Sequence, residues 1–257
     1  MPTTRALRRH ATATATFAAL ALAGTLRAAP PSGPQAAAAN WRVDPEASSF
    51  VVLTHRAGPA ARLAHDHVVV AHDPTIALAF DPRDATRTRV SFVEPVLALE
   101  IDAPEDRQTL EPRLRELGLL REPLGAIDPD ERAKVRAAML DAHQLFADRF
   151  PEIRAELSAV EPGGGASPTD LAAAGTRSGE GEARLAVEIR GTRSEQRVAV
   201  SWSVRGDELD GDLVAELRFT AFGIQPYSSY LGLVRNDDRF DLVAHLVARR
   251  TGAGAAP

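Results

Sequence analysis

The sharpest chemical feature of the sequence is the run His65-Asp66-His67. We predict a strand over 63–71, and on a strand His65 and His67 face the same side. Two neutral imidazoles there, joined by His55 or by an aspartate, could hold a divalent transition metal. Hydrogen bonding at a sheet rim or in a tight loop explains the same residues, and a two-histidine pattern is far less specific than a full ligand set. The pattern therefore favours a structural role over a metal site.

Serine side chains raise a second chemistry, because Ser48, Ser49, Ser228 and Ser229 coexist with histidines and carboxylates. The sequence contains no nucleophile-elbow motif, and these residue types occur together in most chains. It also contains no cysteine, which excludes disulfides, thiolate metal ligands and cysteine nucleophiles. The hydrolase hypothesis rests on no motif, so the sequence predicts a protein that is not an enzyme and requires no cofactor.

The bulk composition limits the partners and the number of domains. The chain has 257 residues, is 44% hydrophobic, and carries a formal net charge of -5. This length suits one generous domain or two small ones, and an all-β barrel can use it alone. The negative balance gives no reason to expect a nucleic-acid partner.

Residues 1–29 have the pattern of a secretory signal. A basic start with three arginines precedes an uncharged stretch of apolar or small residues over 11–22, and Ala21-Leu22-Ala23 fits a cleavage site. The stretch is shorter than the about 20 residues that span a membrane comfortably. We therefore expect export to the periplasm or the exterior, with no stable membrane span after cleavage.

Alternating apolar and polar residues account for most of the chain after residue 40. In the last such segment Phe240, Leu242, Ala244 and Leu246 fall on one face. Similar segments precede it, mostly joined by short turns, with one long Gly/Ser/Ala-rich loop predicted over 161–181. This meander is typical of an antiparallel up-and-down barrel. The preceding segments cover 152–160, 183–190, 197–204 and 212–220.

Two earlier segments carry more specific expectations. Residues 49–55 are apolar on both faces, which predicts a strand that is covered on both sides or twisted into a barrel corner. Residues 89–101 form a long extended segment bent at Pro95, which cannot donate to a sheet ladder.

A helical excursion over about 103–147 interrupts the strands. A first helix is predicted to open at Pro104 and to end at Gly118, with Pro112 in its middle. Asp128 is predicted to cap a second helix, whose apolar stripe continues to Phe146.

The inward apolar side chains of the predicted strands are what a lipid pocket would use. Small barrels are often packed solid, so a filled core explains the same pattern. The many alanines favour space inside the barrel. The predicted lining residues are Phe50, Val52, Leu185, Val187, Val200, Trp202, Leu217, Phe219, Leu242 and Leu246.

In its order of motifs the sequence resembles the YceI-like family over roughly 41–248. The resemblance implies a lipocalin-like barrel domain over 41–250, between a disordered linker (30–40) and a disordered tail (251–257). It also implies export to the periplasm and an isoprenoid or quinone-like chain bound inside the barrel. The chain departs from the family pattern in an apparent insertion over 104–127 and in the histidine-rich patch after His55. The resemblance is carried by Trp41-Arg42-Val43-Asp44-Pro45, Ser48-Ser49-Phe50-Val51, His55, the passages 140–142 and 150–153, Leu185 to Gly191, Phe222-Gly223-Ile224, Leu231-Gly232 and Asp238.

Three functional hypotheses follow from the sequence. The first is an exported, non-enzymatic lipid-binding protein, whose partners are an apolar ligand and, transiently, a membrane partner. The second is a periplasmic metal-binding protein that uses His55, His65 and His67 for a divalent metal. The third is a structural barrel without a ligand.

Overall fold

The structure is a computed structural model that describes residues 41–82, 84–163 and 176–251. The predicted signal segment (1–29), the linker (30–40) and all of the predicted tail except Thr251 lie outside the described residues. Among the described residues, no helix is long and apolar enough to cross a membrane.

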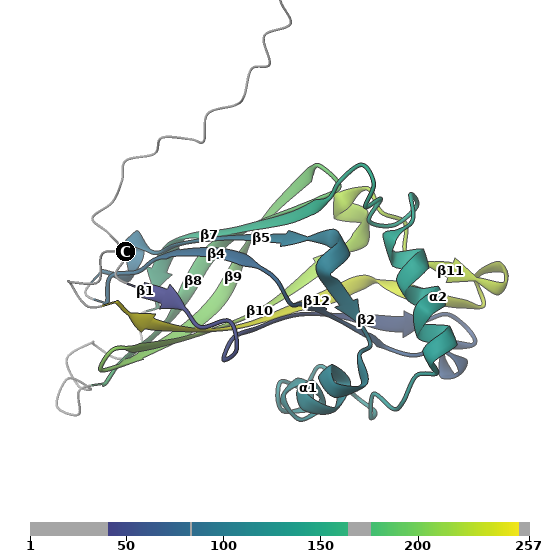
Figure 1. The fold of residues 1–257 in the computed structure, drawn as a ribbon, viewed down its shortest axis with the longest axis horizontal. Coiled ribbons are helices and arrows are strands. Elements are labelled where there is room, and N and C mark those ends of the chain that lie inside the picture. Colours follow the sequence, from purple (N-terminus) through teal and green to yellow (C-terminus); the bar gives the residue numbers. More distant parts are fainter. Residues whose placement is uncertain (1–40, 83, 164–175, 252–257) are drawn as a thin grey trace, which may run out of the picture. The chain divides into compact units, whose positions relative to one another are not determined.

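Strands make up most of the described chain (Figure 1). They are β1 (Trp41–Val43), β2 (Ser49–Ala57), β3 (His67–Ala71), β4 (Thr75–Ala79), β5 (Arg89–Pro95), β6 (Leu99–Ile101), β7 (Glu152–Pro162), β8 (Thr176–Ile189), β9 (Thr192–Arg205), β10 (Glu208–Arg218), β11 (Ser228–Ser229) and β12 (Val234–Arg250). The helices are α1 (Pro104–Glu116) and α2 (Pro129–Leu140), with short 3-10 turns η1 (Ala61–Leu63), η2 (Ala85–Arg87), η3 (Val96–Ala98), η5 (Phe219–Phe222) and η6 (Tyr230–Gly232).

All strand pairs are antiparallel, in the hydrogen-bonded order β4-β5-β7-β8-β9-β10-β12-β2-β3-β6, with β1 and β11 added on β12. The chain itself joins the two ends of this path, because β3 continues into β4 and β5 continues into β6. The segment β3–β4 and the segment β5–β6 each act as one bent strand. The two bent strands pair with each other, β4 with β5 and β3 with β6. The sheet therefore curls back on itself, which confirms the predicted antiparallel barrel.

The bend between β5 and β6 lies where the sequence predicted it. β5 ends at Pro95, and the chain passes through η3 before β6 begins. Because proline has no backbone N–H, it interrupts the ladder at this position. The bend lets one long strand pair with β7 along its first part and with β3 along its second part.

The strand β2 is covered on both faces, as its two apolar faces predicted. Val51 and Leu53 are buried on the outer face in a cluster with Leu114 of α1. Phe50 and Val52 face the barrel interior. Pro112 lies inside α1 without ending it, so the first helix runs through the proline to Glu116. The predicted insertion thus forms the outer cover of β2 and β3.

The second helix is shorter than its apolar stripe predicted. Asp128 caps it as expected, since its side chain accepts hydrogen bonds from the N–H groups of Asp130 (2.9 Å) and Glu131 (3.3 Å). The helix ends at Leu140, where Asp141 accepts a hydrogen bond from the His143 N–H at 2.9 Å. Such local side-chain bonds compete with helical ones. The prediction that the helix continues to Phe146 is therefore wrong.

The predicted loop over 161–181 is also too long. β7 extends to Pro162 and β8 begins at Thr176, where small residues take regular pairing positions. Gly179 and Gly181 pair with Trp202 and Val200 of β9. The small residues here suggested a linker. In the structure they are glycines where neighbouring strands pack closely, with no room for a side chain. Residues 164–175 lie outside the described residues.

Candidate functional site

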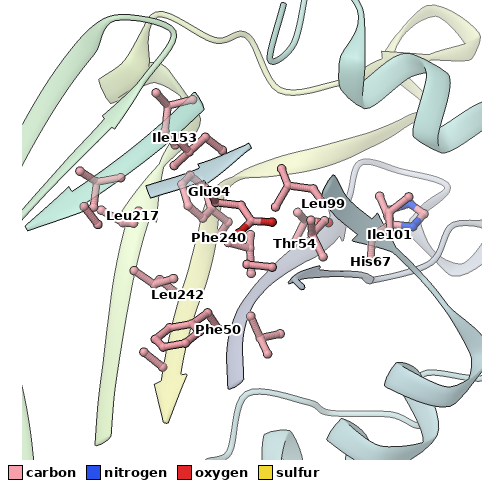
Figure 2. Close-up of a pocket in the computed structure, with 18 of the residues that line it drawn as sticks. Phe50, Thr54, His67, Glu94, Leu99, Ile101, Ile153, Leu217, Phe240 and Leu242 are labelled. Carbon is pink, nitrogen blue, oxygen red and sulfur yellow. The ribbon is translucent and has the colours of Figure 1, made fainter. Parts of the chain in front are cut away.

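The barrel encloses a cavity of ≈ 1160 Å³, lined mostly by apolar side chains (Figure 2). The ten residues that the sequence predicted as pocket-lining all line it, so the interior is hollow rather than filled. They are Phe50, Val52, Leu185, Val187, Val200, Trp202, Leu217, Phe219, Leu242 and Leu246. Of the alanines expected to leave space inside the barrel, Ala155 and Ala244 line the cavity, whereas Ala215 is packed in the core. That these residues bind a ligand stays a prediction.

One end of the cavity is sealed by an aromatic cluster around Trp41 of β1. The Trp41 indole N–H donates to the Phe80 carbonyl oxygen at 3.1 Å, and the two rings meet edge to face at 6.0 Å. Leu78, Leu209 and Ala248 are buried in the same cluster. The Arg250 guanidinium lies over the Trp41 ring, 4.9 Å from its centroid.

The other end opens to solvent between two loops. Side chains that both line the cavity and are exposed mark the opening: Leu63 (73% exposed), Tyr227 and Leu233. The loops are tied together, because the Ala60 N–H donates to the Leu233 carbonyl oxygen at 2.9 Å. Their exposed apolar side chains form a mouth that the strand pattern did not predict.

Three buried polar side chains interrupt the apolar lining. Thr54, Thr88 and Glu94 line the cavity, and their side-chain oxygens have no hydrogen-bond partner among the described residues. Glu94 is only 1% exposed. Burial raises the pKa of Glu94, while the nearby backbone amides of Asp73 and His72 oppose the rise. Sequence reasoning missed Glu94, although it follows Val90 and Phe92 at the inward positions of its strand.

The candidate metal ligands do not form one site. β3 begins only at His67, so His65 lies in the loop before it and the prediction of a strand over 63–71 is wrong at its start. The Gly58 backbone has a positive φ of 96°, and the turn η1 takes the chain out of strand geometry. Among the described residues, no three His, Cys, Asp or Glu side chains are grouped to hold a metal ion.

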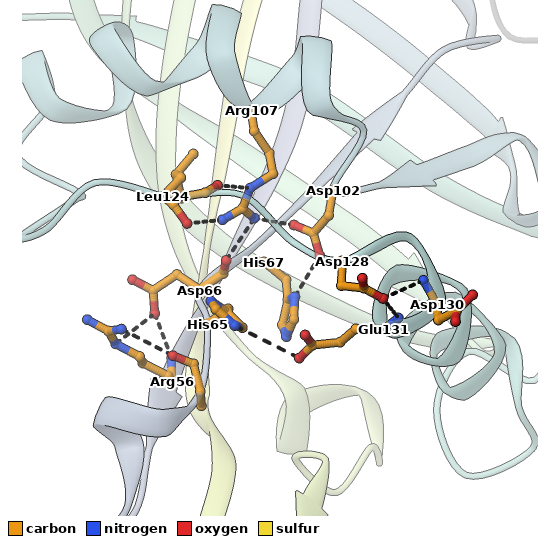
Figure 3. Close-up of polar contacts among 12 residues, drawn as sticks. Arg56, His65, Asp66, His67, Asp102, Arg107, Leu124, Asp128, Asp130 and Glu131 are labelled. Carbon is orange, nitrogen blue, oxygen red and sulfur yellow. Dashed lines mark hydrogen bonds and ion pairs between the residues drawn. The ribbon is translucent and has the colours of Figure 1, made fainter.

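Each candidate histidine has its own carboxylate neighbour instead. His55 Nε2 lies 2.7 Å from Asp241 Oδ2, and His67 Nδ1 lies 2.7 Å from Asp102 Oδ2. His65 is 3.9 Å from Glu131 (Figure 3). His65 and His67 both line the cavity, whereas His55 is not among its lining residues.

The His67 contact belongs to a buried polar network (Figure 3). The Asp102 side chain is fully buried and also accepts hydrogen bonds from the Val68 N–H (2.9 Å) and from Arg107. Arg107 further donates to the backbone carbonyl oxygens of Asp66 and Gly125, each at 3.1 Å. The network joins α1 to the start of β3 and holds the His67 ring in one orientation.

The serines give no support to a hydrolase. Ser48 donates to the Asp44 carbonyl oxygen at 2.6 Å and accepts from the Val247 N–H, so it ties the start of the barrel to its last strand. In the described part of the chain, no serine hydroxyl is hydrogen-bonded to a histidine ring.

The fold and the cavity define a lipocalin-like antiparallel barrel with a hollow apolar interior. No family model and no curated protein matches the sequence. Among solved structures, *Burkholderia cenocepacia* BcnA matches with a TM-score of 0.51 and 15% identity, over 80% of this chain and 99% of that chain.

A polyisoprenoid binding domain from *Saccharophagus degradans* matches with a TM-score of 0.50 and 7% identity, over 83% of this chain and 99% of that chain. The *Campylobacter jejuni* YCEI protein matches with a TM-score of 0.45 and 9% identity, over 70% and 83% of the two chains. The likeness to the first two structures is one of fold, and it confirms the antiparallel barrel that the sequence predicted.

Proposed function

We propose that this protein is an exported, non-enzymatic carrier that holds a long apolar chain, of the isoprenoid or quinone-tail type, inside its barrel. The observation that carries the proposal is the apolar cavity of ≈ 1160 Å³, sealed at Trp41 and open at Leu63. Cavities that hold drug-sized ligands measure roughly 300–1,000 Å³, so this one suits a larger molecule.

The lining gives such a chain its binding energy. Burial of each methylene contributes about 0.8 kcal/mol, so a long tail needs few polar contacts. The solved domain from *Saccharophagus degradans* is described as polyisoprenoid binding, and the proposal extends that ligand class to this chain. Export rests on the signal pattern of residues 1–29.

Mass spectrometry of the mature protein, purified without detergent from its exported form, tests the proposal. We expect a stoichiometric apolar adduct in native spectra, and we expect organic extraction to release it. An elemental scan of the same sample tests the metal-binding alternative. The proposal is wrong if the protein is not exported. It is also wrong if the exported protein retains no lipid and has no affinity for added prenyl chains.

A matched pair of variants locates the ligand. Ala244→Trp places an indole in the cavity, whereas Val214→Trp places one on the outer face of the neighbouring strand. We expect the first variant to lose most of the bound lipid and the second to retain it. Circular dichroism shows whether each variant is folded. Equal retention by two folded variants would place the ligand outside the barrel.

A further inference from the structure

We propose that Thr54 and His67 form a polar subsite inside the apolar cavity, and that this subsite binds the hydroxyl head of a long-chain alcohol. The inference rests on the proposed carrier function and names the head group that the cavity selects. It rests on the two side chains, which both line the cavity, and on the buried pair Asp102 and Arg107 that holds the His67 ring.

The two side chains lie next to each other on adjacent strands of the barrel wall. Thr54 of β2 and His67 of β3 are direct register partners, and both line the cavity (Figure 2). Side chains at directly opposed positions have Cβ atoms about 4.5–5.5 Å apart, so one ligand atom can contact both. The Thr54 hydroxyl is buried and has no hydrogen-bond partner among the described residues. A buried hydroxyl without a partner is destabilising, which points to a ligand that satisfies it.

The hydrogen bonds of His67 define what its free nitrogen can do. Nδ1 lies 2.7 Å from the Asp102 carboxylate, which already accepts from Val68 N–H and Arg107. Because a carboxylate paired with arginine acts as an acceptor, Nδ1 carries the proton in this contact. In the neutral ring Nε2 then presents a lone pair. Nε2 makes no hydrogen bond to any residue that the structure describes.

Together the pair is complementary to an alcohol. A ligand O–H can donate to His67 Nε2 while its oxygen accepts from the Thr54 hydroxyl. An ether oxygen cannot donate, so it can satisfy Thr54 alone. A carboxylate or phosphate head would place negative charge against the Nε2 lone pair, in a cavity that already holds the buried carboxyl of Glu94. The geometry thus selects a neutral hydroxyl head on a long apolar chain.

Competition against a fluorescent apolar probe tests this selection on the delipidated, full-length mature protein. The probes are geranylgeraniol, its methyl ether and geranylgeranyl phosphate, which share one apolar chain. A net hydrogen bond changes affinity by roughly 2- to 13-fold, so we expect the alcohol to bind about tenfold more tightly than the ether. We expect the phosphate to bind more weakly than the alcohol.

Variants locate the subsite. His67→Phe should reduce the preference for alcohol over ether to about threefold or less, while affinity for the ether changes little. Thr54→Val removes the hydrogen bond that both ligands accept, so it should weaken the binding of both by roughly 2- to 13-fold and leave the preference unchanged. Thr88→Val is the matched control, because Thr88 is another buried, unpartnered threonine that lines the cavity elsewhere. It should keep both the wild-type affinities and the tenfold preference. Thermal unfolding shows that each variant is folded. If His67→Phe does not fold, weaker binding of both ligands by Thr54→Val but not by Thr88→Val still tests the subsite.

The outcomes separate this inference from the proposed function. Equal binding of alcohol and ether by the wild-type protein, tighter binding of the phosphate, or a tenfold preference that survives in folded His67→Phe would overturn the hydroxyl subsite and leave the carrier function standing. Weaker binding of both ligands by Thr88→Val but not by Thr54→Val would overturn it too. Failure of every probe to bind would overturn both.

Discussion

Trp202 of β9 and Gly179 of β8 are register partners, and the indole ring fills the space that a side chain at position 179 would need. A Cβ on Gly179 would lie 2.4 Å from the ring atom Cζ2. On its other side Trp202 pairs with Gly211 of β10, where a Cβ would meet nothing closer than 3.9 Å. The absence of a side chain at 179 therefore determines where Trp202 lies in the cavity wall.

Gly179→Ala should displace the Trp202 ring. Because the ring is packed against its neighbours, we expect a loss of about 1–3 kcal/mol in the free energy of unfolding and a changed near-ultraviolet circular dichroism signal. Gly211→Ala is the control, since it adds the same methyl group on the other neighbour of Trp202 in ordinary contact. Equal losses in the two variants would show that crowding against the indole is not the cause.

Much of this fold follows from residue alternation, and the cavity lining shows why. A strand has a side-chain period of two, so choosing the apolar face of β8, β9 and β12 identified wall residues such as Leu185, Val200 and Leu242 correctly. Pro95 likewise predicted the bend, because a residue without an N–H interrupts a ladder. These features depend only on local backbone chemistry.

The polar part of the site depends on contacts between distant residues. The partners of His67 and Arg107 come from segments up to 41 positions away, and nothing in the run 65–67 indicates Asp102 as the orienting carboxylate. His65 was assigned to a strand because alternation continues through it, whereas the turn η1 and the positive φ of Gly58 are set by packing against Leu233. The sequence did not predict the mouth either, because the mouth also depends on contacts between residues that are far apart in the chain.

Glu94 makes stability depend on pH in a direction opposite to that of an ion-paired carboxylate. Its pKa is raised by burial above the ordinary value of 4.5, so the folded protein holds this proton more strongly than the unfolded chain does. Its contribution is most favourable below pH 4.5 and is lost as the pH rises through the folded-state value. Glu94→Gln should therefore raise the melting temperature at pH 7 relative to wild type by more than at pH 4.

The comparison at the two pH values removes the effect of the other carboxylates, which are common to both proteins. Glu180→Gln, at an exposed position on β8, should have the same melting temperature as the wild-type protein at pH 7 and at pH 4. A gain in Glu94→Gln that is equal or larger at pH 4 would contradict the raised pKa.

Arg107 is expected to contribute to stability mainly as the partner of Asp102. The Arg107 side chain is 4% exposed, and its guanidinium donates to the Asp102 carboxylate (Figure 3). Arg107→Met leaves that buried charge without its cation, which typically costs about 3–5 kcal/mol. Arg113→Met on the same helix removes exposed ion pairs with Glu116 and Asp212 and should cost about 1 kcal/mol or less.

Chemical denaturation of a double-mutant cycle with Asp102→Asn separates the pair from the rest of the network. Asparagine tolerates the positive φ of 54° at this position and removes the charge. We expect the double variant to lose less stability than the sum of the single variants, since the two residues share one interaction. Strict additivity would mean that Arg107 acts only through its carbonyl contacts.

Gly58 fixes the mouth of the cavity through its close approach to Leu233. Its φ is +96°, and a Cβ would lie 2.7 Å from the Leu233 carbonyl oxygen, which also accepts from the Ala60 N–H. Gly58→Ala should therefore separate the two loops and accelerate release of a fluorescent apolar probe, with a loss of about 1–3 kcal/mol in unfolding free energy.

Gly118→Ala isolates the backbone part of this effect. Gly118 also has a positive φ, +72°, but a Cβ there would meet no atom within 4 Å. That variant should lose about 1–2 kcal/mol and release the probe at the wild-type rate. Stopped-flow fluorescence measures the release. If Gly58→Ala also released the probe at the wild-type rate, the ligand would not leave between these loops, and the route would have to lie elsewhere in the barrel wall.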